Sequence, residues 1–213
     1  MNSSFLHSLA GSHLYPITDR HLSGLSHADQ VDQLRNRGAT LIQLREKVDT
    51  PSRFYADAEA ALRIARARDV KIIINDRVDI ALALNADGVH LGQDDLAAEA
   101  ARRILGNHAI IGFSTHNLEQ ARRAAQMPLD YVALGPIFAT TTKMSANPPV
   151  GLKGLEHVRQ ALGTIPLVAI GGITSENFRS VLQAGANVVA VISHIWEPAV
   201  KTSTKIQCFL NAS

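Results

Sequence analysis

The chain has 213 residues, enough for one domain with a full hydrophobic core, and 46% of them are hydrophobic, which is ordinary for a globular protein. Its 21 basic and 19 acidic side chains leave a formal charge of +2, which excludes binding to nucleic acid through bulk charge. The single cysteine, Cys208, excludes an internal disulfide framework, and no apolar run reaches the roughly 20 residues that a membrane helix needs.

The first residues lack the basic and then apolar pattern of a signal peptide. A lone cysteine is compatible with a reducing compartment. We therefore expect a cytoplasmic protein with a short frayed tail at residues 1–12 and one domain over residues 13–213.

Short apolar runs alternate with longer helical patterns along the chain. Residues 72–74 and 188–192 are apolar without interruption, which is typical of parallel strands that are covered on both faces. The sequence predicts eight strands, at residues 14–18, 40–45, 71–75, 88–91, 110–114, 131–135, 167–170 and 188–192.

Helical patterns fill the intervals between these strands. Residues 51–68 carry an apolar stripe opposite a charged face, and Thr50 and Pro51 supply a cap and a proline at the first helical position. Further helices are predicted over residues 96–105, 117–126 and 175–183, and small-residue turns that lead back into strands are predicted at 37–39, 85–88 and 184–187.

Repeated strand–helix units form either a closed barrel or an open doubly wound sheet. The chain has no Gly-x-Gly-x-x-Gly turn after its first strand and no Gly-x-x-x-x-Gly-Lys-Ser/Thr loop, the motifs that mark nucleotide-binding open sheets. We therefore expect a single-domain α/β fold, a closed (β/α)8 TIM barrel. The longest irregular stretch, residues 138–150, exceeds an ordinary connection, which predicts a mobile lid over a binding site.

Polar residues gather where nearly all of the predicted strands end. In a barrel of this kind the active site forms at the C-terminal ends of the strands and in the loops that follow them. The pattern therefore indicates an enzyme. The polar segments are residues 43–47, 75–76, 93–95, 114–116, 140–143, 171–172 and 193–194.

The second strand carries the most informative of these segments. Because side chains alternate between the faces of a strand, Ile42 and Leu44 share one face, and Gln43, Arg45 and Lys47 share the other. We expect the apolar pair to meet the helices and the polar set to point into the barrel. Two cations and an amide there suit a polyanion such as a diphosphate. The alternative is a basic strand end paired with a neighbouring carboxylate.

Two aspartates follow the third and fourth strands. Asp76 and Asp95 would lie at neighbouring strand ends, close enough to share a magnesium ion with substrate phosphate. The alternatives are structural. Asp94 is the better candidate to cap the following helix, and Asp76 has Arg77 or Arg45 as a possible ion-pair partner.

Other kinds of catalytic site find little support. No His-x-x-x-His or His-Glu-x-x-His spacing occurs, so the histidines do not predict a zinc site. Ser114 has His116 nearby but no evident third residue for a Ser–His hydrolase. Residues 140–142 form either a polar turn or, with Lys143, an anion-binding loop.

Together these motifs resemble those of thiamine-phosphate synthases, in the same order from about Leu14 to Ser193. One position departs from the family pattern, because Ala139 stands where many relatives have proline; the change removes no ligand. The matching segments are Gln-Leu-Arg-Glu-Lys at 43–47, Asn-Asp at 75–76, Gly-Gln-Asp-Asp at 92–95, Ser-Thr-His at 114–116, Gly-Pro-Ile-Phe at 135–138, Thr-Thr-Thr-Lys at 140–143, Ile-Gly-Gly-Ile at 170–173 and Val-Ile-Ser at 191–193.

The resemblance implies a transferase that joins 4-amino-2-methyl-5-hydroxymethylpyrimidine diphosphate to a thiazole phosphate and releases diphosphate. It implies Mg²⁺ as the cofactor, held by Asp76 and Asp95, and small-molecule substrates rather than nucleic acid or membrane as partners. The residues that it assigns to catalysis are Arg45, Lys47, Ser114 and Lys143. Those assigned to the pyrimidine diphosphate are Gln43, Leu44, Arg45, Glu46, Lys47, Asn75, Ser114 and Lys143. Those assigned to the thiazole phosphate are Thr140, Thr142, Gly172, Ile192 and Ser193, and Thr141 is expected among the substrate-binding residues.

This chemistry requires no protein nucleophile, because departure of diphosphate leaves a resonance-stabilised cation that the thiazole nitrogen attacks. Two alternatives stay open. A related thiazole tautomerase would use His116 as acid or base, although such relatives tend to lack the acidic pair and the Thr-x-Thr-Lys loop. A non-catalytic ligand-binding barrel would have no need of intact diphosphate and magnesium residues. Magnesium-dependent release of diphosphate is predicted by the synthase alone.

Overall fold

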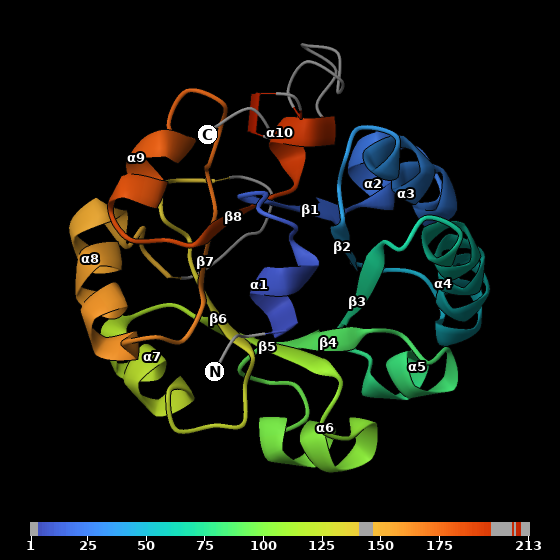
Figure 1. Ribbon diagram of the computed structural model, residues 1–213, viewed down its shortest axis with the longest axis horizontal. Helices are drawn as coiled ribbons and strands as arrows, with labels where there is room; N and C mark the ends of the chain where they lie inside the picture. The colour runs from blue at the N-terminus through green and yellow to red at the C-terminus, as the bar shows by residue number, and fades with distance from the viewer. Residues whose placement is uncertain (1–3, 141–146, 197–205, 207, 210–213) are drawn as a thin grey trace.

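The computed structural model describes residues 4–140, 147–196, 206 and 208–209, and these form a closed barrel of eight parallel strands surrounded by helices (Figure 1). The strands pair in chain order, and β1 closes the barrel against β8. This confirms the predicted (β/α)8 barrel. The strands are β1 (Leu14–Thr18), β2 (Leu41–Leu44), β3 (Lys71–Asn75), β4 (Gly88–Leu91), β5 (Ile110–Thr115), β6 (Tyr131–Leu134), β7 (Leu167–Ile170) and β8 (Val188–Val191).

The helices cover the outside of the barrel, except for the first, which is seen across the middle of the ring in Figure 1 and lies at the end where the strands begin. Within the described residues no helix has both the length and the apolar character that crossing a membrane requires. The helices are α1 (Ser4–Ser8), α2 (Arg20–Ser23), α3 (His27–Arg35), α4 (Pro51–Arg66), α5 (Val78–Ala83), α6 (Ala98–Leu105), α7 (Leu118–Ala124), α8 (Gly151–Leu162), α9 (Phe178–Gln183) and α10 (Ser193–Trp196).

Local sequence signals account for several element ends. The Thr50 side chain accepts a hydrogen bond from the Arg53 N–H, and Pro51 opens α4, as predicted. Asn117 caps α7 in the same way. The predicted small-residue turns are confirmed where Gly38 and Gly185 adopt φ values of 95° and 105°, in the left-handed region that glycine enters without steric cost.

The apolar side chains form two separate clusters, one between the strands and the helices and one inside the barrel. Ile42 and Leu44 belong to the outer cluster and are fully buried. Gln43, between them, points inward, where its Nε2 donates to the Tyr15 hydroxyl at 3.1 Å. The predicted alternation along the second strand is therefore confirmed, and it directs the polar side chains of β2 toward the barrel interior.

The expectation of a frayed segment at residues 1–12 is wrong for its described part, residues 4–12. Residues 4–8 form α1, and Phe5 and Leu9 are 0% and 2% exposed in the inner cluster. Both side chains fill the end of the barrel at which the strands begin. The sequence signal was too short to reveal this, because a single turn of helix buries only two apolar side chains. The domain boundary at residue 13 stays a prediction.

Candidate active site

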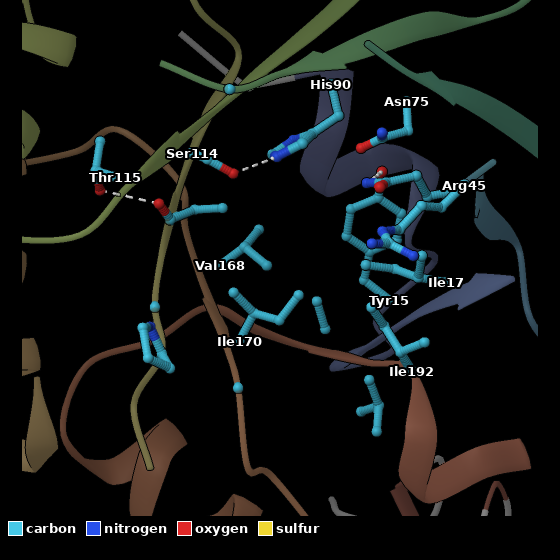
Figure 2. A pocket seen from close by; sticks show the side chains of 18 of the residues that line it. Tyr15, Ile17, Arg45, Asn75, His90, Ser114, Thr115, Val168, Ile170 and Ile192 are labelled. Atoms are coloured by element: carbon cyan, nitrogen blue, oxygen red, sulfur yellow. Dashed lines mark hydrogen bonds between the residues drawn. The ribbon is translucent and has the colours of Figure 1, made fainter. Parts of the chain in front are cut away.

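A cavity of about 300 Å³ opens at the C-terminal ends of the strands, and every strand contributes to its lining (Figure 2). Of the residues predicted to bind substrate or metal, the cavity brings together Gln43, Arg45, Lys47, Asn75, Asp76, Asp95, Ser114, Thr140, Gly172, Ile192 and Ser193. Three other residues from that prediction, Thr141, Thr142 and Lys143, lie outside the described residues, as does much of the predicted lid.

Two further residues from the prediction lie outside the cavity lining. The Leu44 side chain is fully buried against the helices. Glu46 turns away from the cavity, and its Oε1 accepts hydrogen bonds from the backbone N–H groups of Lys47, Val48 and Asp49 at 2.8, 2.8 and 3.1 Å. Glu46 therefore folds the loop that follows β2, and it contributes to the site by directing Lys47.

Burial alone would raise the pKa of Glu46. The three backbone N–H donors, with His27 beside them, lower the pKa overall. The second Glu46 oxygen, Oε2, lies 3.7 Å from His27 Nε2. Glu46 is consequently ionised, and its charge stabilises the turn that carries Lys47 to the rim of the cavity.

Arg45 is anchored by a carboxylate from the neighbouring strand end. Its Nη1 donates to Asp19 Oδ2 at 2.8 Å, and Asp19 also caps α2 by accepting from the N–H groups of His21 and Leu22. This contact occupies one edge of the guanidinium. Arg45 also lines the cavity and carries five N–H donors, so several of them remain for an anion.

Asp76 and Asp95 lie together at the ends of β3 and β4, and Lys47 forms an ion pair with Asp76. Burial raises the pKa of Asp95, and the Asp76 carboxylate beside it adds to the shift, against the hydrogen bond that the Gly92 N–H donates at 2.7 Å. Two adjoining carboxylates share one lysine, so the group carries excess negative charge. A divalent cation would balance it.

The structural roles predicted for these aspartates are not found with the predicted partners, although Asp76 does form an ion pair, with Lys47. Helix α6 begins after Ala97 without a side-chain cap, so the expectation that Asp94 caps it is wrong. Arg77 pairs with Asp79, and Arg45 pairs with Asp19. In the turn before α6, the Gly92 N–H donates a hydrogen bond to the Asp95 carboxylate.

The backbone of Asp76 is held in an uncommon conformation. Its φ of 62° lies in the left-handed region, which costs a residue with a Cβ about 1 kcal/mol or more. The Asp76 N–H donates to the His90 carbonyl at 2.8 Å and fixes this turn. Such strain recurs at functional sites, and here it accompanies a carboxylate at the cavity wall. Among the described residues no group of three or more His, Cys, Asp or Glu side chains could hold a metal, so substrate oxygens and water would complete the coordination shell of an ion.

Asn75 offers an unused hydrogen-bond donor to the cavity. Its side chain is 6% exposed, and its Nδ2 is buried without a hydrogen-bond partner. A buried donor of this kind costs roughly 1–3 kcal/mol unless something binds to it. Because Asn75 lines the cavity, a ligand acceptor is the natural partner for this group.

A chain of hydrogen bonds lies deeper in the cavity. His90 Nε2 is 2.8 Å from Ser114 Oγ, and His90 Nδ1 is 2.8 Å from the Tyr131 hydroxyl, which in turn is 3.1 Å from the Tyr15 hydroxyl (Figure 2). Ser114 therefore pairs with His90 and not with His116. His90 Nδ1 faces the Tyr131 hydroxyl, at the position where a Ser–His–Asp triad would have its carboxylate.

Sequence reasoning missed Tyr15, His90 and Tyr131, which line the cavity. The two tyrosines stand near strand starts within apolar runs, where an aromatic ring predicts ordinary core packing. For His90 a signal existed, because it alternates with Val89 and Leu91, which are fully buried in the outer cluster. Strand alternation alone would have pointed His90 inward.

The opposite wall of the cavity is formed by the ends of β6, β7 and β8. Gly171 and Gly172 have φ values of 98° and 65°, and a Cβ on Gly172 would lie 2.6 Å from the Ala139 carbonyl oxygen. Only glycine lets these two loops approach so closely. Ile192 and Ser193 complete this wall. His116 also lines the cavity, with its Nδ1 at 2.6 Å from the Gly135 carbonyl, which fixes the ring.

Comparison with known proteins connects this arrangement to one chemistry. Residues 14–195 match the family model described as thiamine monophosphate synthase. The chain is 48% identical to the thiamine-phosphate synthase of Clostridium novyi (strain NT) over 183 residues, which cover 85% of this chain and 89% of that protein. It is 46% identical to the thiamine-phosphate synthase of Chloroflexus aurantiacus over 183 residues, which cover 85% and 84% of the two chains.

A solved structure agrees with these relatives. The thiamine phosphate pyrophosphorylase from Pyrococcus furiosus superposes with a TM-score of 0.85 at 34% sequence identity, covering 97% of this chain and 96% of that one. Both the sequence and the fold match along nearly the full length. The chain therefore belongs to the thiamine-phosphate synthase family, transferases that join a pyrimidine diphosphate to a thiazole phosphate and release diphosphate.

Proposed function

We propose that this chain forms thiamine phosphate by a magnesium-assisted dissociative substitution, in which diphosphate leaves the pyrimidine methylene before the thiazole nitrogen attacks. The observation that supports it best is the adjoining carboxylate pair, Asp76 and Asp95, beside the cations Lys47 and Arg45. A site built for a leaving diphosphate needs this combination, because negative charge grows on the leaving group as the bond breaks.

Asp76 and Asp95 would hold Mg²⁺, which supplies positive charge to the diphosphate oxygens when it is bound. Arg45 and Lys47 would bind the same diphosphate from β2, and Lys143 would approach it from the predicted lid. Asn75, through its unused Nδ2, and Ser114 would orient the pyrimidine. Closure of the site would exclude water, which otherwise traps the cation.

The thiazole phosphate would bind at the opposite wall, near Gly172, Ile192 and Ser193, with Thr140, Thr141 and Thr142. Main-chain N–H groups exposed by the two glycines can donate to phosphate oxygens, so this site needs few cations of its own. The separation suits the reaction, because the two anionic substrates meet with their reactive atoms between the two anion sites.

The test is a reconstitution assay. The protein is mixed with 4-amino-2-methyl-5-hydroxymethylpyrimidine diphosphate, the thiazole phosphate and Mg²⁺, and thiamine phosphate and diphosphate are quantified. We expect equal amounts of the two products, loss of both after chelation and recovery when Mg²⁺ is restored. Release of no diphosphate, together with isomerisation of the thiazole phosphate, would instead identify a tautomerase that uses His116. Full activity after exhaustive chelation would contradict the role of the metal.

A further inference from the structure

The N-terminal helix α1 contacts the floor of the cavity through one aromatic side chain. The Phe5 ring stacks on Tyr131 with centroids 4.1 Å apart and meets Tyr15 edge to face at 5.9 Å. Phe5 is fully buried, whereas the next residue, Leu6, is 38% exposed. Residues 4–8 precede the part of the chain that matches the family model, which begins at residue 14. The match to the family model therefore does not account for the contact between Phe5 and Tyr131.

The barrel interior is built to hold the Tyr131 ring in one place. Gly112 is the register partner of Tyr131 on β5, and a Cβ on Gly112 would lie 2.0 Å from the Tyr131 ring. The ring also stacks on His90 with centroids 5.5 Å apart. Tyr131 thus lies between Phe5 below and His90 above, in the space that Gly112 leaves free.

The hydrogen bonds from Gln43 to Ser114 form one continuous chain. The Gln43 Nε2 can only donate, so the Tyr15 hydroxyl accepts from it, while either tyrosine can donate to the other and the Tyr131–His90 direction depends on the His90 tautomer. If Tyr131 donates to His90 Nδ1, His90 Nε2 carries the proton and donates to Ser114 Oγ. Burial raises the pKa of both tyrosines, so each hydroxyl keeps a proton that it can donate.

We propose that Phe5 and Tyr131 are positioning residues of the active site: Phe5 holds the Tyr131 ring from the floor, and the Tyr131 hydroxyl fixes the His90 tautomer that leaves the Ser114 hydroxyl proton to donate into the cavity. The role of Ser114 toward the pyrimidine substrate rests on the proposed function. The tautomer of His90 does not, so the two can fail separately.

The tautomer is tested first, in the ligand-free protein, by the ¹⁵N chemical shifts of the His90 ring, assigned by their loss in His90→Asn. We expect the Nε2–H tautomer alone in the wild-type protein and a mixture of tautomers in Tyr131→Phe, which keeps the ring and loses the hydroxyl. An Nδ1–H tautomer in the wild type, or unchanged shifts in Tyr131→Phe, would overturn the proposal whether or not the protein makes thiamine phosphate.

Steady-state kinetics then test the consequence for the site. In Tyr131→Phe we expect kcat/KM for the pyrimidine diphosphate to fall about tenfold, as for the loss of one oriented hydrogen bond. The KM for the thiazole phosphate should stay within about twofold, because that substrate binds at the opposite wall. Equal losses for both substrates would indicate general damage and would overturn the positioning role.

Phe5 is tested with Phe5→Leu, which keeps an apolar side chain in the floor and removes the ring, and with Leu6→Ala as the matched control on the exposed side of α1. Phe5→Leu should lower kcat/KM for the pyrimidine diphosphate about threefold, and Leu6→Ala should leave it unchanged. Since Phe5 acts through Tyr131, the double variant Phe5→Leu/Tyr131→Phe should be no worse than Tyr131→Phe alone. Multiplicative losses in the double variant would overturn the proposed path.

Discussion

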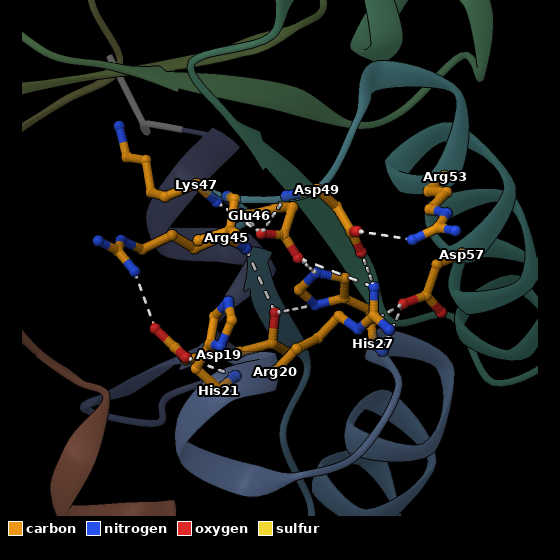
Figure 3. A network of polar contacts seen from close by, with 12 residues as sticks. Asp19, Arg20, His21, His27, Arg45, Glu46, Lys47, Asp49, Arg53 and Asp57 are labelled. Atoms are coloured by element: carbon orange, nitrogen blue, oxygen red, sulfur yellow. Dashed lines mark hydrogen bonds and ion pairs between the residues drawn. The ribbon is translucent and has the colours of Figure 1, made fainter.

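The loop after β2 has two faces with different electrostatics, although its residues are consecutive. Arg45 and Lys47 face the cavity, and Glu46 between them faces a polar network that joins His27, Arg20 and other side chains behind the strand (Figure 3). The Lys47 side chain is 46% exposed, whereas that of Glu46 is 5% exposed. The inner face is open to a ligand, and the outer face is closed by its own protein contacts.

The two faces also differ in the balance of their charges. On the outer face Arg20 forms ion pairs with Asp49, Asp57 and Glu46, and Glu46 has three backbone donors. On the inner face two carboxylates share one lysine. The donors around Glu46 hold the loop in place, although His27 Nε2 on the same face is buried without a hydrogen-bond partner. The carboxylate pair on the inner face is where a cation would balance the charge. We therefore interpret the outer face as the structural support of the loop and the inner face as the binding site.

The largest expected effect comes from the inner face. Asp95→Ala should lower turnover about 10²-fold or more, because it removes one of the two carboxylates proposed to hold the metal. Steady-state turnover at saturating substrates measures the effect. Asp79→Ala is the matched control, since Asp79 is an exposed carboxylate on α5, after the neighbouring strand β3, and pairs with Arg77. Unchanged turnover in Asp95→Ala would remove this residue from the mechanism.

A smaller loss is expected from Arg45→Lys, which keeps the charge of the inner face and loses the planar fork of donors. With one edge of the guanidinium committed to Asp19, the fork lets Arg45 bind the diphosphate as well. We expect kcat/KM for the pyrimidine diphosphate to fall about tenfold, a change equal to one good charge-assisted hydrogen bond. Wild-type kinetics in Arg45→Lys would mean that only the charge at this position matters.

On the outer face, Glu46→Gln tests whether Glu46 supports the loop that carries Lys47 without itself contacting the substrate. The neutral amide oxygen accepts more weakly from the three N–H groups, so the unfolding free energy should fall by about 1 kcal/mol. The loop should then hold Lys47 less firmly, and the KM for the pyrimidine diphosphate should rise about threefold with kcat nearly unchanged. Thermal melts and kinetics measure the two effects. A loss of kcat as large as that of Asp95→Ala would place Glu46 in the chemistry itself.

The smallest effect should appear in the pH dependence of stability. Burial lowers the pKa of His27, and the nearby carboxylates of Asp57, Glu46 and Asp19 offset this only in part, with Arg20 opposing them. The folded protein keeps His27 neutral, while the unfolded chain binds a proton as the pH falls below about 6.5. Stability is therefore full above this pH and is lost as the pH falls toward the folded pKa, by at most about 1.4 kcal/mol per unit.

His27→Gln should make this slope shallower, because glutamine binds no proton in either state. Chemical denaturation between about pH 5 and 8 measures the slope. The control is His157→Gln, at an exposed histidine on α8, which should leave the slope unchanged. An identical slope in His27→Gln would show that His27 is not the group responsible.

The sequence predicted the barrel and the inner face of the loop well, for a physical reason. Strand alternation and apolar runs are local signals, and they directed Arg45 and Lys47 inward without knowledge of the tertiary structure. Asp76 and Asp95 could be brought together because neighbouring parallel strands end at the same rim.

The contacts of the outer face, and those of Phe5 at the bottom of the cavity, could not be predicted from local sequence patterns in this way. Glu46 was grouped with its neighbours as a substrate ligand, since sequence cannot show that a carboxylate will accept from its own loop. Phe5 and Tyr131 are 126 residues apart in sequence and meet only because the barrel closes around them. Contacts of this kind depend on tertiary packing, and neither residue carries a local pattern that predicts them.

The most direct test of the inner face measures whether metal and diphosphate bind as a unit. The affinity for inorganic diphosphate is determined by calorimetry with Mg²⁺ and with chelator, in the wild-type protein and in Asp95→Asn. We predict at least about tenfold tighter binding with Mg²⁺ in the wild type, a coupling that is reciprocal by linkage, and no such gain in Asp95→Asn. Equal affinity with and without Mg²⁺ in the wild type, or a full gain in Asp95→Asn, would contradict the account.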